Sequence, residues 1–158
     1  MISRMPEPAP RSDSGRVTDW NDAPLSLLCD HIVSVHHART REGLERLTGL
    51  VSGAAAPLFG ALRTEVEEHM REEETRLFPA MTALEQHDVD GFPLETIEAY
   101  EAHHVRTGAA IRELRRLLAG EPDALAALEE LDADLHRHIH EENEVLFPRA
   151  LAALGRAY

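Results

Sequence analysis

The sequence predicts an all-α protein, and specifically a four-helix bundle with up-down-up-down topology. Composition is the first indication, because Leu, Ala and Glu are abundant while aromatic residues make up only 4% of the chain. The second is the spacing of apolar residues, which recur at alternating intervals of three and four along four segments of roughly 25 residues each. Short connections between these segments favour antiparallel neighbours, and 158 residues suffice to bury a core between them.

The first predicted helix begins after Asp22 and Pro24, which are helix-start signals, and ends near Gly53. Its inward-facing stripe comprises Val33, His37, Thr40, Leu44, Leu47 and Val51. The second begins at Pro57 and is expected to kink or end early at Pro79, because proline cannot donate a helical hydrogen bond. Its inward-facing stripe comprises Leu62, Val66, His69, Glu73, Leu77 and Ala80.

A loop over residues 86–93 leads to the third predicted helix, which begins at Pro93 and ends at Gly120. Its inward-facing stripe comprises Ile97, Tyr100, His104, Thr107, Ile111, Leu114 and Leu118. The fourth helix follows the segment "GEPD". Its inward-facing stripe comprises Leu128, Leu131, Leu135, His138, Glu142 and Val145.

Domain organisation and partners follow from composition. Residues 1–18 mix Pro, Ser, Arg and Gly without periodicity and are expected to form a disordered tail, so residues 19–158 form the bundle. A formal net charge of −13 argues against a nucleic-acid partner, and the single cysteine, Cys29, excludes an internal disulfide. No apolar run reaches the roughly 18 residues of a membrane span, and no signal-peptide core is present. The expected location is the cytoplasm, without membrane association.

Two segments of the chain repeat one another around a histidine and a glutamate. "HMREEETRLFP" begins at His69 and "HIHEENEVLFP" begins at His138, and each places a glutamate four residues after its histidine. A second pair of related segments, "HHARTREGL" and "HHVRTGAAI", contributes His37 and His104. Six polar residues thus fall on core-facing stripes: His37, His69, Glu73, His104, His138 and Glu142.

Such a set of buried residues indicates a metal site. An unpaired buried carboxylate or imidazole is costly, so the cluster needs mutual pairing or a cation. Residues four apart on a helix share a face, so each histidine and its glutamate can point at the bundle axis. Four imidazoles and two carboxylates suit iron, manganese or zinc, and a carboxylate can bridge two metals. A lone core histidine is more often hydrogen-bonded than metal-bound, but the doubled motif favours the metal.

Other polar residues near the motifs are given lesser roles. His36 and His103 are expected at the edge of the core or in solvent, and His31, His87, His136 and His140 at the surface. Four flanking glutamates are expected to solvate the helices, although Glu72 or Glu141 could support a ligand: Glu72, Glu74, Glu141 and Glu144. Tyr100, one turn before His104, fills the core or lines a pocket.

The motifs resemble those of the hemerythrin-like superfamily, the bacterial HHE cation-binding domains, over residues 19–153. Within it the chain is most similar to the di-iron domain of the bacterial iron-centre repair (RIC) proteins. The matching segments are "DW" at 19–20, "APL" at 23–25, "DHI" at 30–32, "HMREEETRLFP" from 69, "HVRTG" from 104 and "HIHEENEVLFPRAL" from 138. The resemblance places iron ligands on the same six residues: His37, His69, Glu73, His104, His138 and Glu142.

The resemblance implies two iron ions joined by an oxo or hydroxo bridge, with zinc or manganese as alternatives. Two departures from related proteins matter. Oxygen-carrying hemerythrins have a fifth histidine where this chain has Gly108, which would instead line a pocket, and they close the site with H-x-x-x-x-D. Full-length repair proteins carry a cysteine-bearing N-terminal domain, whereas no cysteine precedes Cys29 here. Oxygen carriage, and iron donation that needs that domain, are therefore not implied.

The predicted function is that of a non-haem di-iron protein that binds or reacts with NO, O2 or peroxide in nitrosative or oxidative stress. Activity like that of an NO reductase or a peroxidase would need an electron donor that the sequence does not identify. Repair of iron centres would add an iron-sulfur protein as a client. The alternatives are a non-catalytic protein that binds, senses or stores oxygen or iron, and a bundle that zinc or manganese merely stabilises.

Overall fold

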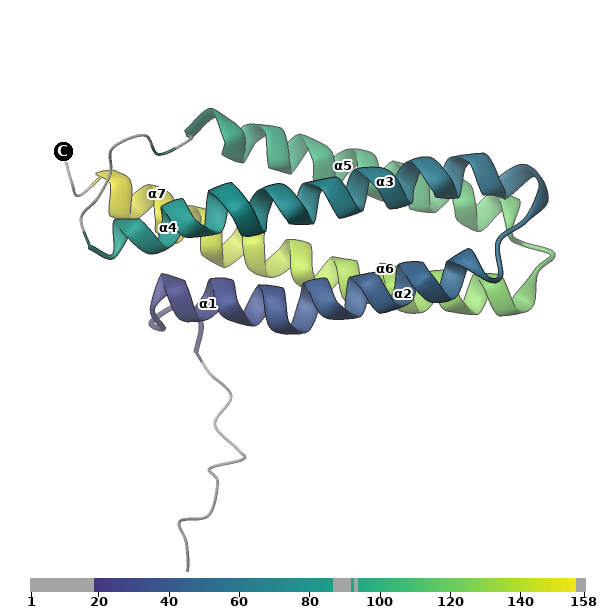
Figure 1. Cartoon of the computed structure of the whole chain (residues 1–158), viewed down its shortest axis with the longest axis horizontal. Coiled ribbons are helices and arrows are strands. Elements are labelled where there is room, and N and C mark those ends of the chain that lie inside the picture. Colours follow the sequence, from purple (N-terminus) through teal and green to yellow (C-terminus); the bar gives the residue numbers. More distant parts are fainter. Residues whose placement is uncertain (1–18, 87–91, 93, 156–158) are drawn as a thin grey trace, which may run out of the picture.

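The computed structural model describes residues 19–86, 92 and 94–155. Four long helices run side by side with alternating direction (Figure 1), and the described residues contain no β-strand, which confirms the predicted all-α bundle. In the bundle, α2 (Ala38–Thr48) contacts α6 (Pro122–Glu141), and α3 (Ala56–Glu72) contacts α5 (Leu94–Leu117). The predicted disordered tail, residues 1–18, lies outside the described residues and stays a prediction.

The first two bundle helices each contain a wider, π-helical segment. The first consists of α1 (Leu25–His31), π-helical η1 (Ile32–His37) and α2 (Ala38–Thr48). The second consists of the 3-10 turn η2 (Gly53–Ala55), α3 (Ala56–Glu72), π-helical η3 (Glu73–Leu77) and α4 (Phe78–Leu84). Gly53 has a φ of 59°, in the left-handed region that favours glycine, and so allows the turn between them.

The third bundle helix is regular and the fourth is not. The third is α5 (Leu94–Leu117). The fourth consists of α6 (Pro122–Glu141), π-helical η4 (Glu142–Leu146) and α7 (Phe147–Gly155). Pro122 lies in the first turn of α6, where a missing N–H does not interrupt the helix.

Two of the three π-helical segments in the described residues, η3 and η4, begin at the glutamates of the repeated motif. The N–H of Phe78 donates to the carbonyl of Glu73, and the N–H of Phe147 donates to the carbonyl of Glu142, five residues back in each case. Pro79 follows the first of these turns and does not end the helix, which continues to Leu84. The prediction of an early end at Pro79 is therefore wrong, because the proline lies in the first turn of α4.

The apolar core is divided in two by a polar layer. One cluster of buried side chains includes Leu44, Val66 and Leu131, and the other includes Ile32, Leu77 and Leu146. On each bundle helix the candidate metal ligands lie between the residues of these two clusters. The apolar layers on either side exclude water from the polar one.

Candidate metal centre

The six residues selected from the sequence converge in the middle of the bundle. Glu73, Glu142 and His37 are fully buried, and the three other histidines are at most 7% exposed: His69, His104 and His138. They come from all four bundle helices. No other part of the core in the described residues holds so many buried polar side chains.

Each carboxylate directs its two oxygens to different histidines. Oε2 of Glu73 lies 3.3 Å from Nε2 of His37, and Oε1 lies 2.9 Å from Nε2 of His69. Oε1 of Glu142 lies 2.7 Å from Nε2 of His138, and Oε2 lies 3.1 Å from Nε2 of His104. This arrangement is what two bridging carboxylates require.

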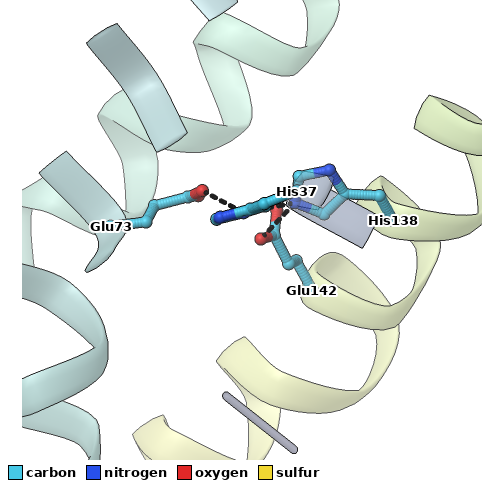
Figure 2. A group of neighbouring side chains, drawn as sticks. All are labelled: His37, Glu73, His138 and Glu142. Atoms are coloured by element: carbon cyan, nitrogen blue, oxygen red, sulfur yellow. Dashed lines mark hydrogen bonds and ion pairs between the residues drawn. The ribbon is translucent and has the colours of Figure 1, made fainter. Parts of the chain in front are cut away.

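The ligand atoms form two groups of four that share the glutamates. One group contains His37 and His138 (Figure 2) and the other His69 and His104, and within each group the ligand atoms lie within 4.8 Å of one another. The Nε2 atoms of each histidine pair face each other at 3.2 Å. Two imidazole nitrogens so placed need a proton or a cation between them, so each group can hold one metal ion.

Several of these atoms have no hydrogen bond. Both oxygens of Glu73, and Oε2 of Glu142, accept none from the described residues, although imidazole nitrogens lie close by. A buried carboxylate in that condition costs free energy, and a cation would remove the cost. The mixed nitrogen and oxygen donors match iron, manganese and zinc. The residues present therefore fit a pair of such ions.

The electrostatics of the cluster also favour a bound cation. Burial, together with the nearby Glu142, raises the pKa of Glu73 to about 7. Burial also opposes ionisation of Glu142, but the charge of His138 and the close approach of the His104 and His138 imidazoles to its two oxygens hold its pKa well below the ordinary value. Burial lowers the pKa of His69 to about 4, so this imidazole is neutral near pH 7 and keeps a lone pair for a metal.

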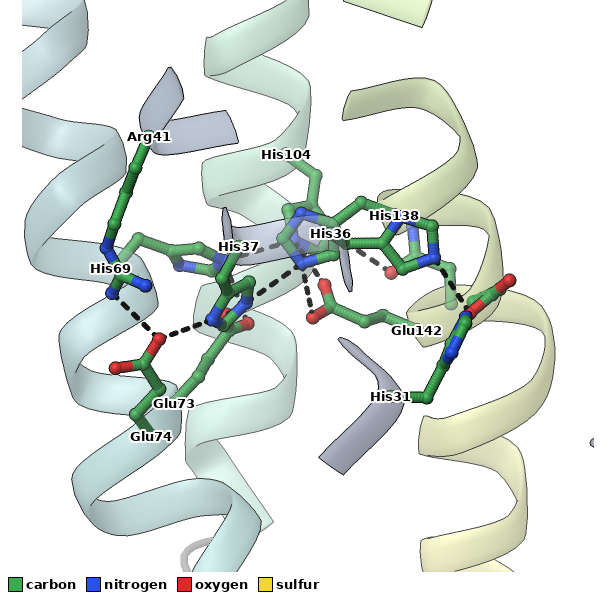
Figure 3. Close-up of polar contacts among 12 residues, drawn as sticks. His31, His36, His37, Arg41, His69, Glu73, Glu74, His104, His138 and Glu142 are labelled. Atoms are coloured by element: carbon green, nitrogen blue, oxygen red, sulfur yellow. Dashed lines mark hydrogen bonds and ion pairs between the residues drawn. The ribbon is translucent and has the colours of Figure 1, made fainter. Parts of the chain in front are cut away.

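Two residues behind the histidines were not identified from the sequence as their partners. Nδ1 of His37 lies 2.7 Å from Oε1 of Glu74, and Nδ1 of His104 lies 3.1 Å from Oδ1 of Asn143. Glu74 is held in turn by Arg41 at 2.8 Å (Figure 3). Glu74 and Asn143 occupy the same position in the two motifs, directly after the motif's buried glutamate. That shared position in the repeat could have identified both residues as partners of the histidines, but Glu74 was expected only to solvate its helix.

The remaining histidines are placed differently from one another. His36 and His103 are 4% and 8% exposed, so the expectation of a solvent position for either is wrong. Nε2 of His36 lies 3.1 Å from Oε2 of Glu141, while the ring of His103 stacks on His69 with centroids 4.1 Å apart. His136 and His140 are exposed as predicted, His31 is partly buried, and His87 lies outside the described residues.

Tyr100 and Gly108, the two predicted pocket residues, have different surroundings. Tyr100 is 3% exposed, packs in the apolar cluster, and contacts His69 edge-on with centroids 4.8 Å apart. Gly108 lines a cavity of about 500 Å³, together with His104 and Asn143. This cavity opens beside one histidine pair only.

The fold and the site define a four-helix metal-binding protein. The chain belongs to the hemerythrin family, because the model of the hemerythrin HHE cation binding domain matches residues 30–150. The metal-binding site follows from that membership and from the clustered histidines and glutamates. In the part of the chain that the structure describes, no helix combines the length and apolar character that crossing a membrane requires.

Within the family, the chain is similar to proteins named for the repair of iron-sulfur clusters. The chain is 32% identical to an iron-sulfur cluster repair protein YtfE of Edwardsiella ictaluri (strain 93-146), with 84% of this chain and 69% of that protein covered. It is 31% identical to the protein of that name from Yersinia pseudotuberculosis serotype IB (strain PB1/+), with the same coverage. Identity to the protein of that name from Escherichia coli O157:H7 is 30%, over 85% of this chain and 70% of the relative.

Proposed function

We propose that this chain is a non-haem di-iron protein that binds or reacts with NO, O2 or peroxide during nitrosative or oxidative stress. The observation that carries the proposal is the division of each buried carboxylate between the two histidine pairs. A single ion would use one oxygen of each carboxylate and leave the others buried without a partner. Two ions use all of them.

The proposed ligands divide into two sets. His37 and His138 would hold one ion, His69 and His104 would hold the other, and Glu73 and Glu142 would contribute to both. Iron is favoured over zinc or manganese because the related proteins are named for the repair of iron-sulfur clusters. When bound, two ferrous ions would supply the two electrons needed to reduce a peroxide or a pair of NO molecules.

The protein's own groups fix the ligands and control access. Glu74 and Asn143 accept hydrogen bonds from Nδ1 of their histidines, so Nε2 of each ring is left for the metal. The two apolar clusters exclude water on either side of the polar layer. The cavity bordered by Gly108 gives a small uncharged molecule a route towards His104.

The names of the relatives extend the proposal to a biological role. By analogy with them, this chain contributes to the repair of damaged iron-sulfur proteins, which would be its clients. The cytoplasm is the proposed location, and a redox protein that remains to be identified is the proposed electron donor. These points depend on the di-iron assignment and are tested after it.

Freshly purified protein from iron-replete cells provides the first test. We expect about two iron atoms per chain by elemental analysis, and Mössbauer spectra of paired high-spin sites. Anaerobic addition of NO or peroxide to the ferrous protein with an electron donor should give multiple turnovers. A stable stoichiometric adduct would support a binding or sensing protein instead. Reproducible zinc or manganese without iron would overturn the proposal and leave a metal-stabilised scaffold.

A further inference from the structure

A second group of metal-ligand side chains lies beside the centre, and the proposed function does not use it. Nε2 of His31 and Nε2 of His36 lie 3.6 Å and 3.1 Å from the same oxygen, Oε2 of Glu141. The three ligand atoms all lie within 4.8 Å of one another. Figure 3 shows His31 to one side of the six candidate ligands, and its ring centroid lies 5.1 Å from that of His36. None of the three belongs to the six.

The cluster differs from the buried centre in its access to solvent. The side chains of His31 and Glu141 are 26% and 20% exposed, whereas His36 behind them is 4% exposed. An ion held here keeps part of its coordination shell open to water. Two imidazoles and one carboxylate with open positions form a donor set that suits divalent iron and its first-row neighbours.

We propose that His31, His36 and Glu141 bind a divalent first-row transition ion, and that this is where iron is held on its way to the buried centre. The loading role rests on the proposed function. His36 and Glu141 directly precede His37 and Glu142 in the chain, and the ring of His36 stacks on His138 with centroids 5.8 Å apart. A hydrated ion must lose water before it enters a fully buried site, and this cluster can replace part of that shell at the surface.

The other half of the repeat lacks this cluster. His103 corresponds to His36 and Glu72 to Glu141, but Glu98 stands where the first half has His31. His103 instead stacks on His69, and Glu72 is exposed. The three-residue cluster is therefore not a by-product of the two-fold repeat. Glu72 is the matched control for Glu141, because each directly precedes a bridging glutamate.

Trp20 provides a direct readout of binding. It is the single tryptophan of the chain, and its ring centroid lies 4.5 Å from that of His31. Iron-loaded protein titrated with Co²⁺ should show saturable quenching of Trp20 fluorescence, complete at one added equivalent. Glu141→Gln and His31→Gln should each weaken binding by about tenfold or more, with Glu72→Gln unchanged. Absence of saturable quenching, or an equal loss in Glu72→Gln, would overturn the site.

The loading role has its own measurement. Metal-free protein mixed anaerobically with Fe²⁺ should fill more slowly in His31→Gln, by about threefold or more, and reach the same final iron content. Circular dichroism checks that each variant is folded. Equal filling rates would overturn the loading role. Failure to bind iron in the centre of the unmodified protein would overturn the proposed function, while Trp20 quenching would still decide whether the cluster binds an ion.

Discussion

The two halves of the centre have the same candidate ligands and different surroundings. Behind His37 stands the carboxylate of Glu74, which is also paired with Arg41. Behind His104 stands the neutral amide of Asn143. Gly108 occupies the position that corresponds to Arg41, four residues after the histidine, and lines the cavity there. The inner layer of the site, which consists of the six candidate ligands, is thus symmetric. The layer of residues behind the histidines is not.

This difference separates two requirements. Bridging two ions demands equivalent donors on both sides, which a repeated motif supplies. Reactivity and access are set by the residues behind those donors, and these can differ without disturbing the bridge. A carboxylate behind an imidazole makes it a stronger donor than an amide does, so an ion held by His37 would favour the higher oxidation state. Under the proposed function, the cavity would let an incoming ligand approach the ion on the His104 side.

Removing a bridging carboxylate is the most severe test of the shared inner layer. Glu73→Ala and Glu142→Ala should both reduce iron content from about two per chain to below one, because each deletion removes a ligand from both ions. Stability of the loaded protein should fall by on the order of 3 kcal/mol, since metal binding no longer favours the folded state. Elemental analysis and chemical denaturation measure the two effects.

Measurements on metal-free protein sharpen this test. Without iron, each alanine variant should lose less stability than it does in the iron-loaded protein, because the buried carboxylate that it removes is itself costly to desolvate. Glu72→Ala, at an exposed neighbouring position, serves as the control for both. Retention of two irons by either variant would show that the carboxylates do not bridge.

Filling the cavity beside Gly108 should remove the easier access that a small ligand has to the His104 side of the centre. Gly108→Arg gives the second half the residue that the first half has at position 41. A Cβ at Gly108 meets only Nη1 of Arg112, at 3.5 Å, so the helix should accept the change. We expect NO binding to the ferrous protein to slow by roughly tenfold, with iron content unchanged, as measured by anaerobic stopped-flow spectroscopy.

Gly60→Arg is the matched control for this variant. Gly60 is an exposed helical glycine whose added Cβ would have no contact within 4 Å. It should leave the NO-binding rate as it is. If Gly108→Arg and Gly60→Arg bind NO equally fast, the ligand does not approach through the cavity.

The apolar spacing predicted the four helices. It also placed six polar residues on the core-facing sides of those helices, because a regular helix places every third or fourth residue on one side. Register within the π-helical segments could not be predicted in this way. The regular pattern placed Ala80 and Val145 inward, but Met81 and Leu146 are the fully buried residues. An extra residue in each π-helical turn shifts the following positions by one.

The hydrogen-bond partners of the candidate ligands were harder to predict than the clustering of the six residues. Glu74 lies among consecutive glutamates, and composition alone favours solvent for all of them. Which of these reaches a histidine depends on how two helices pack, and a single sequence does not contain that information. His103 is similar, because its ring packs on His69 of another helix.

A smaller change should make the two halves electronically alike. Glu74→Gln leaves a neutral amide behind each histidine, so the two irons should become more similar in Mössbauer spectra, with a narrower difference between their quadrupole splittings. Iron affinity should fall by roughly tenfold at the site held by His37. Asn143→Asp is the reciprocal variant, with a carboxylate behind both histidines. Spectra that do not change in either variant would show that the residues behind the histidines leave the two ions electronically unaffected.

Of the variants considered, His136→Ala should have the smallest effect on stability, iron content and NO binding, and it therefore serves as a negative control for the set of six candidate ligands. His136 also lines the cavity beside His104, but its side chain is 88% exposed and its Nδ1 lies 4.0 Å from Oδ1 of Asp132. Exposed pairs of this kind contribute little, so the free energy of unfolding should change by less than about 0.5 kcal/mol. Iron content and NO-binding rate should both be unchanged in elemental analysis and stopped-flow experiments. A loss of iron in this variant would mean that the exposed His136 supplies a ligand. The ligands would then not be the symmetric set of six residues on which the comparison of the two halves is based.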